Sequence, residues 1–184
     1  MKALIVGAGG VGESMAAIAA RRDSQGELFE EIVLADYSLA RAQRVSQRLD
    51  EDRFPAEQVD AADPDAVAAL AARHAVDIIC NMLPVNYAMP MMQAALKARR
   101  HIMDSGVSLS EPHPTDPYNQ VGKLLGSDQF TLYAEFERIG KLALLGQGIE
   151  PGMADYAFPS GLTEMESEYK RPHDHQTLTM PLTT

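Results

Sequence analysis

The stretch Lys2-Ala3-Leu4-Ile5-Val6-Gly7-Ala8-Gly9-Gly10-Val11-Gly12 decides the fold of this chain. Its apolar start predicts a strand, and Gly7-x-Gly9-x-x-Gly12 predicts a tight turn that opens a helix. Gly7 permits the turn, Gly9 leaves the backbone open to a pyrophosphate, and Gly12 lets helix and strand pack closely. Apolar residues then recur at helical spacing, at Met15, Ile18 and Ala19. The unpaired N–H groups at a helix start favour phosphate, so we predict a dinucleotide-binding unit. Its phosphate-binding residues would be Gly7, Ala8, Gly9, Gly10, Val11 and Gly12.

In dinucleotide-binding proteins an acidic residue follows the glycine motif by roughly 20 residues. This chain has an acidic residue near that spacing. Asp36 ends the apolar run of residues 31–36. Its carboxylate would accept hydrogen bonds from the adenosine ribose and repel the 2′-phosphate of NADP, so we expect NAD rather than NADP. Arg41, one helical turn further on, would weaken that preference. The alternative is that Asp36 merely precedes a helix that Ser38 caps.

The composition indicates an acidic globular protein with one main domain. The 184 residues, 46% of them hydrophobic, suffice for a packed core. A formal net charge of −10 argues against a surface for nucleic acid or for an anionic membrane. The single cysteine, Cys80, excludes an internal disulfide and is expected to be a small buried hydrophobe. No apolar run approaches the roughly 18 residues of a membrane span, and we expect no cleavable signal and a cytoplasmic protein.

Apolar runs and helical patterns alternate along the chain. Strands are expected at residues 2–6, 31–36, 57–59, 76–80, 101–104 and 142–145. Helices are expected after the glycine motif and at residues 38–49, 63–74, 87–98 and 130–139, the third of them opened by Asp63-Pro64-Asp65. Residues 107–129, interrupted by prolines, predict a long loop over the carboxyl edge of the sheet, a candidate lid. The alternation predicts an α/β fold with a doubly wound parallel sheet, the Rossmann fold.

The ends of two further strands supply the other candidates for the cofactor site, because ligands bind outside the carboxyl ends of parallel strands. Asp60 and Ala61 would flank the adenine. Asp60 would accept a hydrogen bond from the adenine amino group, or it is a solvated turn residue. Leu83 and Pro84, within the turn of residues 81–84, would lie beside the ribose and nicotinamide.

Two carboxylates are weak candidates for catalysis. Asp104 would contact a substrate amine or the nicotinamide ribose, or it only caps the next loop. Glu150 would pair with a substrate ammonium group, or it lies in solvent. His74 and His101 are expected to be structural, and no metal site is expected, because residues 173–175 (His-Asp-His) lack a third ligand. Three methionines are expected to pack in the core or to form an apolar wall facing the dinucleotide: Met89, Met91 and Met92.

Three blocks of residues together resemble the saccharopine dehydrogenase-like family. They are the glycine motif with Asp36, the Asn81-Met82-Leu83-Pro84 turn with Asp104-Ser105-Gly106, and Leu145-Gly146-Gln147-Gly148-Ile149-Glu150-Pro151-Gly152-Met153. This family includes saccharopine reductases, lysine 6-dehydrogenases, carboxynorspermidine dehydrogenases and homospermidine synthases. The resemblance implies that the glycine motif binds the pyrophosphate, Asp36 the ribose, and Leu83-Pro84 the nicotinamide side. It also implies oxidation or reduction of a carbon–nitrogen bond in an amino acid or polyamine, with a nicotinamide cofactor as hydride carrier.

The resemblance covers residues 1–155, which we expect to form the dinucleotide-binding domain. Family members continue into a second domain that binds substrate and forms the dimer. Residues 156–184 instead predict an irregular tail, a truncated start of that domain at most, so the second domain is expected to be missing. The alternative function is therefore a non-catalytic NAD(H)-binding module with a sensing or regulatory role. An uncovered apolar edge at residues 146–153 would favour self-association, with a homodimer as its simplest form.

Overall fold

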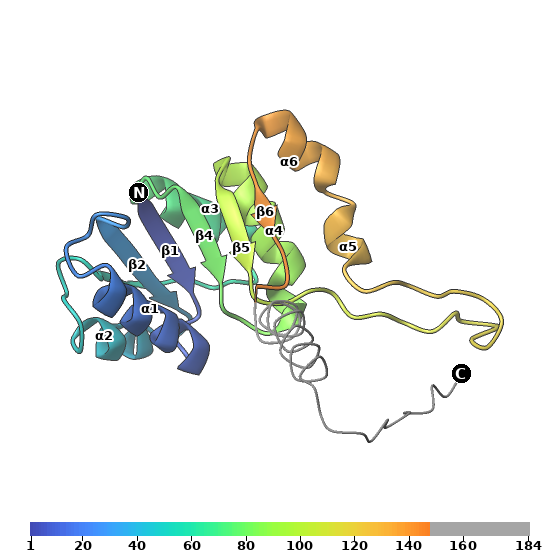
Figure 1. Ribbon diagram of the computed structural model, residues 1–184, viewed down its shortest axis with the longest axis horizontal. Helices are drawn as coiled ribbons and strands as arrows, with labels where there is room; N and C mark the ends of the chain where they lie inside the picture. The colour runs from blue at the N-terminus through green and yellow to red at the C-terminus, as the bar shows by residue number, and fades with distance from the viewer. Residues whose placement is uncertain (148–184) are drawn as a thin grey trace, which may run out of the picture.

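The computed structural model describes residues 1–147, which form a parallel sheet with helices on both faces (Figure 1). Its six strands are β1 (Lys2–Val6), β2 (Glu31–Asp36), β3 (Ala56–Gln58), β4 (Ile78–Asn81), β5 (His101–Asp104) and β6 (Ala143–Leu144). They lie in the order β3-β2-β1-β4-β5-β6, and every neighbouring pair is parallel. The order reverses between β1 and β4. The predicted doubly wound α/β sheet, the Rossmann fold, is confirmed.

Two apolar layers hold the helices on the sheet. Alternate residues of β1 enter different layers: Ala3 and Ile5 pack toward α1 (Gly10–Arg22) and α2 (Leu39–Ser46). Leu4 and Val6 pack toward α3 (Pro64–Arg73), α4 (Ala88–Ala98) and α6 (Tyr133–Ile139). In Figure 1, α1 lies in front of the sheet and α4 behind it. Because both faces are covered, the strands are apolar almost throughout.

The structure differs from the prediction mainly at the ends of elements. The expected helix 87–98 is α4, which begins one residue later than predicted, and the short 3-10 helix η1 (Val85–Tyr87) precedes it. A short helix, α5 (Ser127–Phe130), precedes α6. α2 ends at Ser46, earlier than expected. Ile18 does not belong to the buried side of α1, because its side chain is 46% exposed, whereas Ala16 is fully buried.

The starts of two helices show why one cap could be predicted and the other could not. The Asp63 carboxylate accepts hydrogen bonds from the Asp65 and Ala66 N–H groups, at 2.9 and 3.1 Å, as predicted for α3. Ser38 occupies the capping position of α2, but its side chain makes no capping hydrogen bond. Ser38 therefore stands at the predicted capping position, but the prediction that its side chain caps the helix is wrong.

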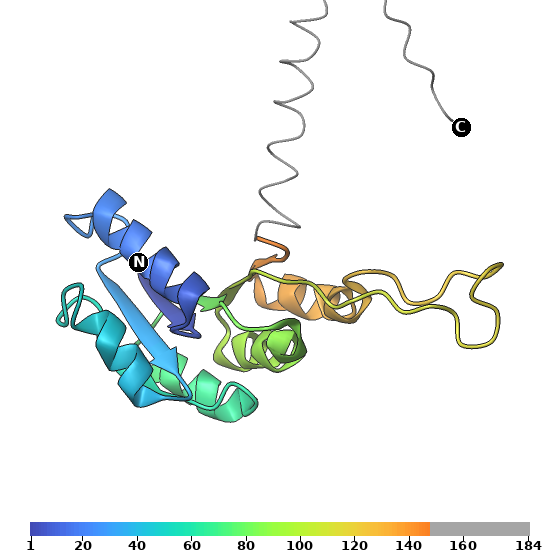
Figure 2. The ribbon, with the colours of Figure 1, turned by 90° about the horizontal axis from the view of Figure 1, so that it is seen from below.

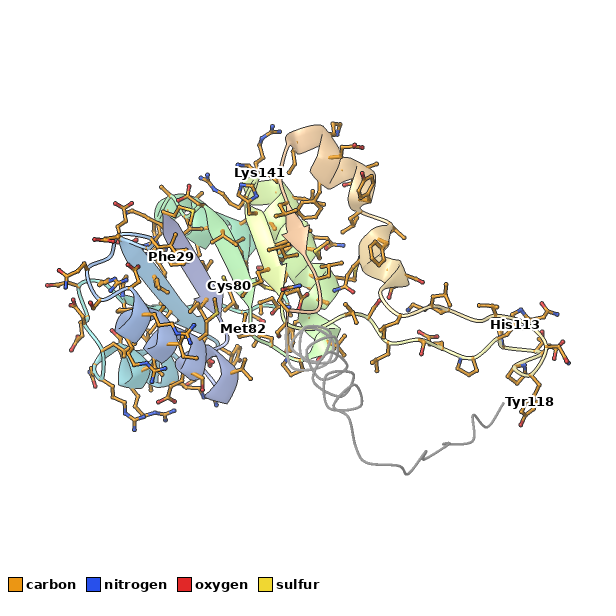
Figure 3. All side chains as sticks on the ribbon, viewed as in Figure 1. Phe29, Cys80, Met82, His113, Tyr118 and Lys141 are labelled. Atoms are coloured by element: carbon orange, nitrogen blue, oxygen red, sulfur yellow. The ribbon has the colours of Figure 1, made fainter. Side chains whose placement is uncertain are left out.

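Residues 107–126 do not cover the carboxyl edge of the sheet. They run outward from β5 and return to α5, and two perpendicular views show them extending away from the helices and strands (Figures 1 and 2). Backbone hydrogen bonds of 3.0 and 2.8 Å join Glu111 and Lys123 on the two arms of this segment. His113 and Tyr118 lie at its far end (Figure 3). The predicted lid is corrected to a projecting ribbon, which we call the 107–126 ribbon.

None of the helices within residues 1–147 combines the length and the apolarity needed to cross a bilayer.

Candidate dinucleotide-binding site

The glycine motif forms a tight turn between β1 and α1. Gly7 has a φ of +100°, a conformation that side-chain-bearing residues rarely adopt. A Cβ atom on Gly7 would also lie 2.7 Å from Leu83 Cδ2. A Cβ atom on Gly12 would overlap the carbonyl oxygen of Gly7. These two glycines therefore allow the close packing that the sequence predicted.

Gly9 and Gly10 lie in a different environment. A Cβ atom built on either residue would have no atom within 4 Å of it, apart from its own chain neighbours and, for Gly10, the adjoining backbone of α1. Gly9 occupies the capping position of α1, a helix of 13 residues, and its carbonyl accepts the first helical hydrogen bond, from Glu13 N. The N–H groups of the first turn have no partner within the helix. An open backbone beside these groups is what a pyrophosphate requires.

Asp36 holds this turn from the end of β2. Its side chain is 4% exposed; Oδ2 accepts a hydrogen bond from Ala8 N and Oδ1 accepts one from Ser38 N, both at 2.9 Å. The guanidinium of Arg41 lies beside the same carboxylate, with Nη1 3.2 Å from Oδ1 and 3.4 Å from Oδ2. The two backbone contacts were not predicted. The spacing between Asp36 and Ser38 is the available signal, because aspartate commonly bonds the N–H two residues on.

A cavity of about 530 Å³ lies at the carboxyl ends of the strands, where the strand order reverses. Its volume is within the usual range for a small-molecule site. The cavity brings together predicted residues from four strand ends: Gly7, Asp36, Asp60, Ala61, Leu83 and Pro84. Tyr37, Arg41 and Tyr87 also line it, and only Arg41 was singled out from the sequence.

Asp60 fits both interpretations that the sequence left open. It lines the cavity and is exposed, so it could face an adenine. Its Oδ1 also accepts a hydrogen bond from Ala62 N at 2.9 Å, as a turn residue would. These two roles are compatible, because the carboxylate has a second oxygen.

Asp104 lies deeper than a substrate-binding carboxylate would be expected to lie. It is 1% exposed, and Oδ1 accepts a hydrogen bond from Gly106 N at 2.9 Å. Burial raises the pKa of Asp104, and the Gly106 N–H and the neighbouring side chains of Asn81 and Gln129 only partly offset this effect. This geometry matches the loop-capping alternative.

The remaining side chains that the sequence singled out make contacts typical of structural residues. His74 Nε2 lies 2.8 Å from Glu57 Oε1, and His101 Nδ1 accepts a hydrogen bond from Leu142 N at 3.0 Å. Cys80 is 2% exposed, and burial raises its pKa to about 12, so it is the buried hydrophobe that was expected. Met91 and Met92 are buried in the core and Met89 is partly buried. Within residues 1–147, no group of three His, Cys, Asp or Glu side chains could hold a metal ion.

Several predictions fall outside the described residues. They concern Glu150, the Pro151-Gly152 pair, the tail at residues 156–184, the histidines at residues 173–175 and most of the apolar edge at residues 146–153.

Comparison with known proteins agrees with this geometry. The family model described as the saccharopine dehydrogenase NADP binding domain matches residues 3–144. The chain is 27% identical over 152 residues to carboxyaminopropylagmatine dehydrogenase from Synechocystis sp., and the match covers 83% of this chain and 35% of that protein.

Two solved structures share the fold. One is the apo form of histidine-tagged saccharopine dehydrogenase (L-Glu forming) from Saccharomyces cerevisiae, with a TM-score of 0.65 and 17% identity over 90% of this chain and 31% of that one. The other is an NAD binding oxidoreductase from Klebsiella pneumoniae, with a TM-score of 0.52 and 17% identity over 78% of this chain and 34% of that one. The chain thus spans about a third of the length of each of these three proteins.

Proposed function

Because the chain belongs to the saccharopine dehydrogenase NADP-binding domain family, we propose that it is the NAD(P)-binding part of an oxidoreductase. The observation that carries this proposal is the cavity at the reversal of the strand order. It joins Gly7 to the strand ends that carry Asp36 and Leu83, next to the open start of α1. In this type of fold, dinucleotides bind at that point.

The residues present fit a nicotinamide dinucleotide. The first turn of α1 would bind the pyrophosphate beside Gly9, and the cavity between Asp36, Asp60 and Leu83 would hold the adenosine. A bound cofactor would supply the hydride chemistry, while the protein binds it, orients it and excludes water. The described residues have this binding and orienting role.

We propose a carbon–nitrogen bond of an amino acid or polyamine as the reacting group. The support is the resemblance of the sequence blocks, together with relatives named carboxyaminopropylagmatine dehydrogenase and saccharopine dehydrogenase. The second candidate is a non-catalytic NAD(H)-binding module. It is favoured by Asp104, the one catalytic candidate within residues 1–147, because this carboxyl is buried and bonded to the loop after β5.

A turnover assay separates these two functions. The 184-residue chain is incubated with NADH or NADPH and a panel of keto acids and amines, and with the oxidised cofactors and a panel of amino acids and polyamines. A change in NAD(P)H absorbance that depends on one such substrate supports the oxidoreductase. Saturable cofactor binding without turnover on any of them supports the non-catalytic module.

The preference between NAD and NADP follows from Asp36 and Arg41. Asp36 lines the cavity, but its carboxylate already accepts two backbone N–H groups, which partly offset the negative charge that would repel a 2′-phosphate. Arg41 lies against that carboxylate, lines the cavity, and has a side chain that is 50% exposed. We therefore propose that the site accepts NADP as well as NAD, with Arg41 contacting the 2′-phosphate.

Arg41→Gln tests this assignment. We expect the affinity for NADPH to fall about tenfold, which corresponds to roughly 1.4 kcal/mol, while the affinity for NADH changes by less than about twofold. Arg44→Gln, on the same helix but not lining the cavity, is the matched control and should leave both affinities unchanged. Equal losses for the two cofactors in Arg41→Gln would contradict the 2′-phosphate role. The measurement is fluorescence titration of the bound reduced cofactor.

A further inference from the structure

Two buried polar side chains are neighbours at the carboxyl ends of β4 and β5. Asn81 and Asp104 are opposite each other in the parallel register, with exposed fractions of 0% and 1%. Ser105 joins the same strand ends, because its N–H and its hydroxyl both donate to the carbonyl oxygen of Asn81 at 3.2 Å. Buried polar groups are costly unless they are hydrogen-bonded, so this pair needs an explanation.

Asn81 fixes the turn that follows β4. Its Oδ1 accepts a hydrogen bond from Leu83 N at 3.3 Å. Leu83 packs directly on the glycine turn, where a Cβ atom added to Gly7 would come within 2.7 Å of Leu83 Cδ2. Leu83 also lines the cavity. The position of the Asn81 amide therefore sets the position of a side chain that touches the proposed cofactor site.

The Asp104 carboxyl accepts hydrogen bonds from residues that follow β5. Oδ1 accepts from Gly106 N, and Oδ2 accepts from Gln129 Nε2 at 3.4 Å. Gln129 is 1% exposed, and its Oε1 accepts from Ser108 N at 2.7 Å. Asn81 Nδ2 is buried without a hydrogen bond within residues 1–147, and the Asp104 carboxyl is the acceptor of the neighbouring strand. Gly106 N and Gln129 Nε2 thus both donate to this carboxyl.

We propose that Asn81 and Asp104 are positioning residues that hold the nicotinamide side of the cofactor site, and this inference rests on the proposed function. In the proposed site the adenosine would lie between Asp36 and Asp60, which line the cavity, and the pyrophosphate would lie at the glycine turn after β1. The remaining half of a dinucleotide must continue past β1 to the ends of β4 and β5. Asp104 acts there through Asn81 and Leu83, so it is not a catalytic residue.

Asp104→Asn tests this role because it preserves size while replacing one acceptor oxygen with a donor NH₂ group. At least one buried donor then faces another donor, and the strand ends must shift. The double variant Asn81→Asp/Asp104→Asn exchanges the two groups. It restores an acceptor beside a donor, with Leu83 N still able to donate to residue 81. Asp52→Asn, at an exposed aspartate, is the matched control.

The readout is the affinity for NADH compared with the affinity for ADP-ribose, which lacks the nicotinamide. For Asp104→Asn we expect NADH binding to weaken about tenfold and ADP-ribose binding to change by less than about twofold. The double variant should recover at least half of the lost NADH binding free energy, and Asp52→Asn should match the wild type. A general loss of structure would lower the affinity for both ligands, and the double variant would not recover it.

The outcomes separate this inference from the proposed function. A wild-type chain that binds neither ligand overturns the proposed function, and the inference with it. A wild-type chain that binds both, with equal losses or no loss in Asp104→Asn, overturns the inference alone. If Asp104→Asn does not fold, Gln129→Met removes one donor from Asp104 and is measured in the same way. A selective loss of NADH binding supports the inference, and an equal loss or none overturns it.

Discussion

At the scale of single residues, the glycines at the start of α1 differ in what surrounds them. Gly12 lies against the backbone carbonyl of Gly7, whereas a Cβ atom on Gly10 would have no atom within 4 Å. Backbone cannot move aside as a flexible side chain can. The glycine motif therefore combines a packing requirement at Gly12 with open space at Gly9 and Gly10.

Gly12→Ala and Gly10→Ala should consequently change stability in opposite directions. We expect Gly12→Ala to lower the free energy of unfolding by about 1–3 kcal/mol, because overpacking of a close contact has that cost. Gly10→Ala, at the first position of α1, should raise it by up to about 1 kcal/mol, since alanine favours helix more than glycine does. Urea denaturation followed by circular dichroism measures both. A stable Gly12→Ala variant would show that α1 and β1 are not packed as described.

At the scale of elements, an ion-pair cluster joins α3 to the edge of the sheet. Glu57 on β3 accepts from His74 Nε2 at 2.8 Å and pairs with Arg73 Nη2 at 2.7 Å. Burial alone would raise the pKa of Glu57, but the hydrogen bonds and charges of His74 and Arg73 outweigh it and lower the pKa below its ordinary value of 4.5. Folding therefore favours the ionised form of Glu57.

This cluster predicts a pH dependence of stability. A carboxyl whose pKa is lower in the folded chain stabilises the fold above its unfolded pKa and loses that contribution as the pH falls through its folded pKa. We expect the wild type to be more stable than Glu57→Gln at neutral pH, with a difference that shrinks below about pH 4.5. Denaturation midpoints between neutral and acidic pH measure it. A difference that stays constant into the acid range would contradict the role given to Glu57.

Helix starts and irregular segments could be predicted where the signal is local in sequence. Asp63-Pro64-Asp65 is a local signal, since the cap and the first helical residue are neighbours in sequence, and it predicted the start of α3 correctly. Ser38 gave an equally good local signal, but its side chain forms no cap. Its backbone N–H instead donates to Asp36, a contact that the cap pattern does not contain. The prolines correctly predicted irregular chain at residues 107–126. The direction of that ribbon depends on contacts distant in sequence, such as Ser108 N with Gln129 Oε1, which no local pattern contains.

At the scale of the whole molecule, the alternation of strands and helices was enough to predict the doubly wound parallel sheet and the place of the candidate site. Residues from four strand ends meet in one cavity because parallel strands present their carboxyl ends at the same edge. The sequence did not predict that the Asp36 carboxylate accepts two backbone N–H groups, or that Asn81 and Asp104 form a buried pair. Both depend on which oxygen meets which N–H group after the sheet has assembled.

We propose that the glycine turn and the start of α1 bind the pyrophosphate of a dinucleotide. Calorimetric titration of the 184-residue chain with NADH and with NADPH, compared with the same titrations of Gly9→Val, tests this assignment. Because nothing lies within 4 Å of a Cβ atom on Gly9, the variant should keep the fold while its side chain occupies the pyrophosphate space. We expect saturable binding of one dinucleotide per wild-type chain, and an affinity at least about a hundredfold weaker for a folded Gly9→Val. Equal binding by the two proteins, or none by the wild type, would contradict it.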